Sequence, residues 1–235
     1  MKESEIFPIP ETCIIRQSKI FKNLNKSELE KVSIEKTCEP YKKGTIIYKE
    51  NSHVNGIFCI YKGIIKIYKT GIDGKEQIIR FAKPGDLIAF RSVLSGELAC
   101  TTAKVLEDSI LCYIPSETLF YLIKNNGNFA LELLQLTCKE LDEANSYIKD
   151  IAQKTVRERL AEILLHLKEN FELDNEHFLK ITLSREELAN IVGTATETVI
   201  RLLSEFKNDN FIELYGRKIK ILNIQALEKL ANQYD

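Results

Sequence analysis

Residues 184–221 read SREELANIVGTATETVIRLLSEFKNDNFIELYGRKIKI, and this stretch decides the fold of the C-terminal part of the chain. Ser184 and Glu187 have the spacing of a capping box, which predicts that a helix begins here. Gly193 interrupts the apolar pattern of that helix, as expected of a tight turn. A second helix should follow, because apolar residues recur at intervals of three and four at Val199, Leu202, Leu203 and Phe206.

Two short apolar runs follow the second predicted helix and flank a tight, basic turn, Tyr-Gly-Arg-Lys at residues 215–218. This pattern predicts a β-hairpin. A helix, a turn, a second helix and a basic hairpin in this order are typical of a winged helix-turn-helix, which places its second helix in the major groove of DNA. We therefore expect double-stranded DNA as a partner.

The outer face of the second helix carries the candidate base-reading residues Glu197, Ile200 and Arg201. Arginine pairs with guanine, glutamate accepts from the cytosine amino group, and isoleucine can pack against a thymine methyl. Two plainer interpretations stay open: Glu197 could cap the helix together with Thr194, and Arg201 could be an ordinary solvated charge. Residues expected to support the contact or to bind phosphate are Arg185, Thr196, Thr198, Ser204, Arg217 and Lys218.

Composition limits how such a contact can work. The chain has 235 residues, 44% of them hydrophobic, and a formal net charge of -1. From Gln153 onward acidic residues slightly outnumber basic ones, so DNA must be met by a local basic patch rather than by bulk charge. Phosphate contacts of that kind predict a steep salt dependence of binding.

A short amphipathic helix is expected at 24–34, capped by Asn25 or Ser27. From Cys38 to Pro115 the sequence changes to short β-branched and aromatic runs separated by glycine turns. Residues 1–20 show no clear period and predict a loosely packed arm. Regularly spaced short strands indicate an antiparallel sandwich or barrel. The expected strands are 45–48, 56–61, 64–69, 77–81, 87–90, 101–105 and 110–114.

Beyond Pro115 the pattern is helical. Ser116 should cap a first helix, and a long helix should start near Asn128 with an apolar stripe at heptad spacing. Such a stripe predicts pairing of two identical helices, although it could instead pack on the chain's own β-domain. The predicted dimer residues are Leu134, Cys138, Leu141, Ile148 and Ile151.

A further helix over 155–170 should enter the DNA-binding part through a helical hinge near residues 150–155. We therefore predict a sensor or effector domain with its arm at 1–125, a dimerisation helix at 126–152 and a winged helix-turn-helix domain at 153–235.

A β-roll, a long helix and a winged helix in this order resemble the Crp/Fnr family of bacterial transcription regulators. The most specific parts are Pro84–Ile88 (PGDLI) and Glu197–Leu203 (ETVIRLL). The resemblance implies an α+β fold: an N-terminal double-stranded β-helix (a cyclic-nucleotide-binding-like β-roll), a dimerisation helix and a C-terminal winged helix-turn-helix. It also implies a homodimer that meets RNA polymerase and reads a palindrome of TGA-like half-sites.

The chain differs from cyclic-AMP-binding members of the family at the positions that hold the nucleotide. Members that bind cyclic AMP have Gly-Glu-Leu after the Gly-Asp turn and an Arg-Ser or Arg-Thr pair shortly after it. Here Ala89-Phe90-Arg91 and Ala99-Cys100-Thr101 take these places, so cyclic AMP is not expected. The candidate effector pocket comprises Phe90, Arg91, Cys100 and Thr101.

The six cysteines are scattered, and in a reducing compartment they should be small buried hydrophobes. Cys112 falls where the oxygen-sensing Fnr branch keeps an iron-sulfur ligand, but Cys13 is alone in the N-terminal arm, and a cluster needs four thiolates. A cluster would have to recruit Cys38 or Cys100. Neither a cluster, nor haem on the lone His53, nor another metal is expected. A thiol switch through Cys13, Cys100 or Cys112 stays open.

No apolar run is long enough for a membrane span and no secretory signal pattern opens the chain, so we expect a cytoplasmic protein without a membrane partner. A metal enzyme on a small cupin-like barrel is the alternative of another class. It would need clustered histidine and carboxylate ligands, which the sequence does not offer, and it leaves the winged helix unexplained. We therefore expect no enzyme activity.

Overall fold

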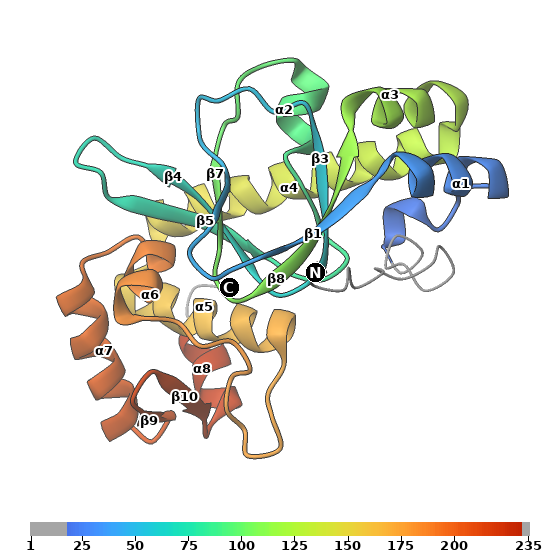
Figure 1. The fold of residues 1–235 in the computed structure, drawn as a ribbon. Helices are drawn as coiled ribbons and strands as arrows, with labels where there is room; N and C mark the ends of the chain where they lie inside the picture. The colour runs from blue at the N-terminus through green and yellow to red at the C-terminus, as the bar shows by residue number, and fades with distance from the viewer. Residues whose placement is uncertain (1–17, 232–235) are drawn as a thin grey trace, which may run out of the picture. The chain divides into compact units, whose positions relative to one another are not determined.

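The computed structural model of the protein describes residues 18–231 (Figure 1). The chain divides into two compact units. The first runs to Gly74 and resumes over Ile79–Leu141, and the second comprises Lys75–Ile78 and the chain from Asp142 onward. The predicted N-terminal arm, with Cys13, lies almost entirely outside the described residues.

The first unit begins with a short 3-10 helix η2 (Lys19–Phe21) and helix α1 (Lys26–Glu35). Asn25, rather than Ser27, caps α1: its side chain accepts from the backbone N–H of Glu28 at 3.0 Å. The Glu28 carboxylate in turn accepts from the backbone N–H of Asn25 at 2.8 Å. This reciprocal capping box satisfies two amides that the first turn leaves without partners.

Two four-stranded sheets form the body of this unit. Their order is β1-β8-β3-β6 and β2-β7-β4-β5, and the registered pairs are antiparallel. The predicted double-stranded β-helix is thus confirmed. The strands are β1 (Thr37–Tyr41), β2 (Ile46–Tyr48), β3 (Gly56–Lys62), β4 (Ile65–Thr70), β5 (Glu76–Ala82), β6 (Leu87–Ile88), β7 (Thr102–Val105) and β8 (Ser109–Pro115).

Three local predictions for this unit are corrected. The structure adds strand β1, which the sequence does not predict because Glu39 and Pro40 break its apolar alternation. The expected strand over 87–90 ends at Ile88, since Ala89 adopts a left-handed conformation (φ 69°) and starts helix α2 (Phe90–Ser95). Ser116 does not cap helix α3 (Ser116–Asn125); it is the first helical residue, after Pro115.

A disulfide between Cys38 and Cys112 joins β1 to β8, with the two Cα atoms 4.0 Å apart. The two cysteines are direct partners in the register of these strands, and the buried Cys59 of β3 is opposite Cys112 on its other side. The prediction that the cysteines are only small buried hydrophobes is therefore wrong for this pair, and it is also wrong for the exposed Cys100 and Cys138. Strand register, which the sequence does not reveal, decides which thiols meet.

Reduction of this disulfide is expected to lower the free energy of unfolding by about 2–4 kcal/mol. The bond links residues 74 positions apart and so restricts the unfolded chain over a long loop. Urea unfolding with and without a phosphine reductant measures the difference. The exposed Cys138→Ser variant should show the same difference, because Cys138 is outside the bond. Equal midpoints for protein shown by mass spectrometry to be oxidised and reduced would contradict the prediction.

The long helix α4 (Gly127–Gln153) is followed by α5 (Val156–Phe171), and the two are not continuous. Thr155 has an extended backbone (ψ 160°) and caps α5 in a capping box with Glu158. The expected helical hinge near 150–155 is therefore interrupted by a helix start. The capping signal Thr-x-x-Glu was present in the sequence and explains the break.

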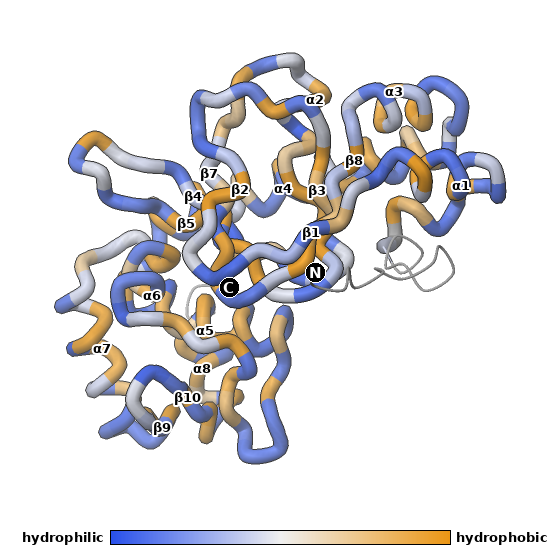
Figure 2. The backbone as a smooth tube through the Cα atoms, in the orientation of Figure 1, coloured by the Kyte–Doolittle hydropathy of each residue, from blue (hydrophilic) through white to orange (hydrophobic). Residues whose placement is uncertain are grey.

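The rest of the second unit is the predicted winged helix-turn-helix: α6 (Arg185–Val192), α7 (Thr196–Asn208), and a wing of β9 (Ile212–Tyr215) and β10 (Lys218–Ile221). A final helix, α8 (Ile224–Ala231), packs on α5. Figure 2 shows apolar and polar segments alternating along α7, as a helix with one buried face requires.

Candidate DNA-binding interface

The turn between α6 and α7 positions the second helix. Ser184 caps α6 as predicted, accepting from the N–H of Glu187 at 3.1 Å. Gly193 ends that helix with φ 74°, a conformation that favours glycine because it has no Cβ. The N-cap of α7 is Ala195, with no side-chain cap. The alternative role for Glu197, a capping box with Thr194, is therefore wrong.

Helix α7 buries one face and exposes the other. Its apolar stripe, Val199, Leu202, Leu203 and Phe206, is buried. The three candidate base-reading residues, Glu197, Ile200 and Arg201, are exposed. Ile200 is 49% exposed, which leaves it available for an apolar contact.

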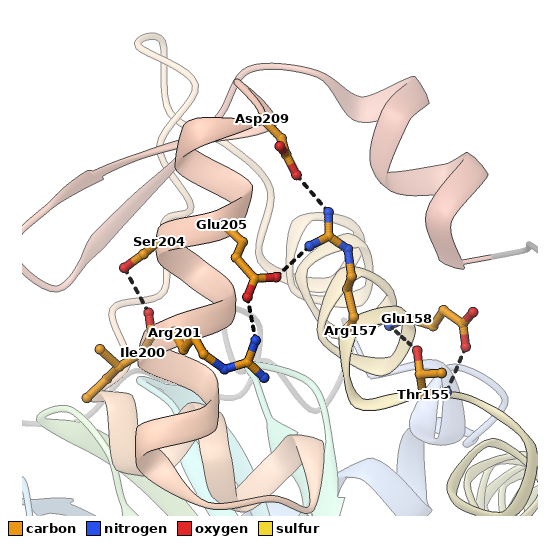
Figure 3. Close-up of polar contacts among 8 residues, drawn as sticks. All are labelled: Thr155, Arg157, Glu158, Ile200, Arg201, Ser204, Glu205 and Asp209. Carbon is orange, nitrogen blue, oxygen red and sulfur yellow. Dashed lines mark hydrogen bonds and ion pairs between the residues drawn. The ribbon is translucent and has the colours of Figure 1, made fainter.

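Smaller polar residues surround these three on α7. The hydroxyl of Ser204 donates to the backbone carbonyl of Ile200 at 3.0 Å, so it is occupied within the helix (Figure 3). Thr196 and Thr198 are half-buried in the first turn. The N-terminus of α7 also presents backbone amides, which attract a phosphate.

The wing offers the basic tip that the sequence predicted. Arg217 and Lys218 are exposed at the turn between β9 and β10. The Lys218 ammonium lies 5.8 Å from the centre of the Phe178 ring, a cation-π distance that keeps the charge at the surface while its stem packs.

Arg185 lies between α6 and the wing. Its Nη2 donates to the backbone carbonyl of Gly216 at 2.7 Å, while its Nη1 is buried without a hydrogen-bond partner. Burial lowers the pKa of its guanidinium, because the charged form loses water. Arg185 thus holds the wing turn against the first helix of the motif, a role the sequence did not suggest.

The five predicted dimer residues form an apolar stripe along α4. Leu134, Cys138, Leu141, Ile148 and Ile151 are all exposed in the single chain. Leu141, which lies in the same unit as the β-sheets, is 62% exposed and is therefore not covered by them. Exposed apolar stripes of this kind mark interaction surfaces.

The four predicted effector residues, Phe90, Arg91, Cys100 and Thr101, line one small pocket of the first unit. Phe90 and Thr101 are buried, whereas Arg91 and Cys100 are exposed. Burial raises the pKa of Tyr48, which lines the same pocket. The pocket leaves room for little more than a water molecule.

Glu140 of α4 also lines this pocket, and it forms ion pairs with the two arginines there, Arg80 and Arg91. Its carboxylate lies 3.0 Å from Nη2 of Arg80 and 3.2 Å from Nε of Arg91. Sequence reasoning missed both Arg80 and Glu140, because they are 60 positions apart and no local motif connects them. An internal carboxylate thus already pairs with both arginines of the pocket.

The described residues do not fit a four-thiolate cluster. Cys112 and Cys38 are bonded to each other in an apolar core, so neither offers a thiolate. His53 is exposed. Within residues 18–231 no three His, Cys, Asp or Glu side chains are grouped so that they could hold a metal ion.

Comparison with known proteins decides the family. Residues 38–126 match the family model described as a cyclic nucleotide-binding domain, and residues 158–230 match the Crp-like helix-turn-helix domain. The fumarate and nitrate reduction regulatory protein of Escherichia coli is 31% identical over 222 residues, covering 93% of this chain and 88% of that protein. The chain belongs to the Crp/Fnr family of transcription regulators.

Solved structures of the Crp/Fnr family have the same fold. FixK2 from Bradyrhizobium japonicum superposes with a TM-score of 0.75 at 26% identity, covering 83% of this chain and 96% of that one. A family regulator from Thermus thermophilus has a TM-score of 0.67 at 24% identity, covering 83% and 98%. This Crp/Fnr protein is therefore a DNA-binding regulator and not a cupin-like enzyme.

Proposed function

We propose that this regulator acts as a homodimer that reads a palindrome of TGA-like half-sites. The observation that carries the proposal is the outer face of α7, where Glu197, Ile200 and Arg201 are exposed together. Arg201 would bind guanine and Glu197 the amino group of the paired cytosine. Arg185, Thr196, Thr198, Ser204, Arg217 and Lys218 would support the helix or contact phosphate.

The two copies would meet through the α4 stripe. A single winged helix reads one half-site, so pairing through residues 126–152 would supply the second at a fixed spacing. Residues 1–125 would form the sensor or effector domain and residues 153–235 the DNA-binding domain. A DNA-binding transcription regulator would act in the cytoplasm and contact RNA polymerase there.

Binding-site selection from a palindrome library, repeated at several salt concentrations, tests the proposal. The selected half-site should contain TGA or a close variant, and the affinity should fall steeply with salt. The Ile200→Ser variant should change the preference at one base, because a hydroxyl replaces the apolar contact with a thymine methyl. An unchanged preference would exclude Ile200 as a reader, and no preference at any salt would contradict the proposal.

We further propose that cyclic AMP is not the effector, because Phe90 and the Glu140 carboxylate occupy the pocket that a nucleotide would need. Saturating cyclic AMP should leave the unfolding temperature unchanged. A ligand at a hundred times its Kd would add about 2.7 kcal/mol of stability. A regulator of this family that binds cyclic AMP serves as the positive control, and a saturable upward shift for this chain would contradict the prediction.

The Cys38–Cys112 disulfide favours a second candidate, a thiol-based redox sensor. In a reducing cytoplasm such bonds are typically transient and regulatory. DNA affinity measured with the pair oxidised and reduced tests this, and equal affinity would exclude it. The ultraviolet-visible spectrum of anaerobically purified protein tests haem and an iron-sulfur cluster, since either would absorb where thiols do not.

A further inference from the structure

Arg157 of α5 contacts two carboxylates at the C-terminal end of α7, those of Glu205 and of the C-cap residue Asp209. Its Nη1 donates to Glu205 Oε2 at 2.7 Å and its Nη2 donates to Asp209 Oδ2 at 2.7 Å (Figure 3). Its guanidinium also lies over the Phe206 ring, 5.1 Å from the ring centre. Two hydrogen bonds and a ring contact together fix the plane of the guanidinium.

In the ion pair between Arg157 and Asp209, neither charge is stabilised by the dipole of its own helix. Arg157 lies in the first turn of α5, two residues after the Thr155 cap, where the helix dipole repels a cation. Asp209 is the C-cap of α7, where the dipole repels an anion. Each charge is therefore compensated by the other helix, and the bridge holds α7 to α5 at this point.

The network of ion pairs extends from Glu205 to Arg201, one of the predicted base-reading residues. The other carboxylate oxygen of Glu205, Oε1, accepts from Nη1 of Arg201 one helical turn away (Figure 3). Glu205 is thus shared: one oxygen binds Arg157 and the other binds Arg201. The four charges alternate in sign from Asp209 through Arg157 and Glu205 to Arg201.

We propose that Arg157 is a positioning residue for base reading, acting on Arg201 through Glu205. The inference rests on the proposed role of Arg201 at guanine. With Arg157 in place, the Glu205 carboxylate is held from one side, and its other oxygen holds the guanidinium of the long Arg201 side chain. An ordered side chain loses less conformational entropy when it binds a base.

Loss of Arg157 has two consequences. Glu205 becomes free to turn, so Arg201 is no longer held in one orientation. Asp209 also loses its compensating cation, and Glu205 keeps only Arg201 as a partner, which leaves one more unbalanced negative charge on the helix that would approach phosphate. The first effect lowers discrimination between bases, whereas the second weakens all DNA binding equally.

The test compares the full-length wild type with Arg157→Gln, Arg157→Lys, Glu205→Gln and the double variant Arg157→Gln/Glu205→Gln. Affinities are measured for the selected palindrome and for one altered at the base assigned to Arg201, and their ratio is the readout. Arg157→Gln should lower this ratio about tenfold, a size typical of coupled neighbours. Arg157→Lys keeps the positive charge but loses the planar guanidinium that can bind two carboxylates at once, so it should lower the affinity ratio nearly as much.

The double variant decides whether Arg157 acts through Glu205. If it does, Arg157→Gln has no further effect on the ratio once Glu205 is Gln. An unchanged ratio in Arg157→Gln, or an undiminished effect in the Glu205→Gln background, overturns the proposal. If Arg157→Gln fails to fold by circular dichroism, Asp209→Asn replaces it: this variant removes one of the two carboxylates that hold Arg157 and should lower the ratio in the same direction.

Arg201→Ala in the same assay separates this inference from the proposed function. If Arg201→Ala leaves the ratio unchanged, Arg201 is not a reader, and both the proposed function at this residue and the inference fail. If Arg201→Ala lowers the ratio and Arg157→Gln does not, only the inference fails.

Discussion

Arg201→Ala is expected to abolish most of the sequence preference of the dimer, raising the Kd for its palindrome about 30-fold or more. A bidentate contact to a base contributes about 1–3 kcal/mol of discrimination. Each dimer loses two such contacts, one per half-site, so the total is about 2–6 kcal/mol. Gel-shift titration against the selected palindrome and an unrelated duplex measures the loss.

Lys218→Ala is the matched control, because it removes a cation from the wing and not from α7. It should weaken binding to both duplexes equally and lower the salt slope by about one per half-site. If Arg201→Ala behaved like Lys218→Ala, with equal loss on both duplexes, Arg201 would be a phosphate contact and the assignment would be wrong.

Leu141→Glu combined with Ile148→Glu is expected to produce a folded monomer that has lost about a hundredfold or more in affinity for the palindrome. Both side chains are largely exposed in the single chain, so the change should cost the fold little. In a paired helix the same carboxylates would be buried without partners. Two linked half-site contacts gain about 10²–10⁴ over one, and the monomer forfeits this gain.

Light scattering reports the mass and gel shift reports the affinity. Ser146→Glu is the control, because Ser146 is exposed on α4 and lies outside the predicted stripe; this variant should stay dimeric and bind normally. A double variant that remains dimeric would show that the two copies meet elsewhere.

Local signals in the chain were sufficient for the DNA-binding part. The Ser184 capping box, the glycine at Gly193 and the spacing of the apolar stripe on α7 each depend on residues a few positions apart. For that reason the two helices and the wing were predicted with nearly correct ends. The Thr155 capping box is equally local, and it starts a new helix where the absence of proline and glycine predicts a helical hinge.

Local sequence patterns predict the two-part organisation, the winged helix-turn-helix and the exposed face that carries Glu197, Ile200 and Arg201, because periodicity and capping are encoded over a few residues. The pairing of distant side chains becomes visible in the folded chain alone: Cys38 with Cys112, Glu140 with Arg80 and Arg91, and Arg157 with Glu205 and Asp209. Strand register and helix packing set these pairs, and both depend on contacts between residues tens of positions apart, which leave no local pattern.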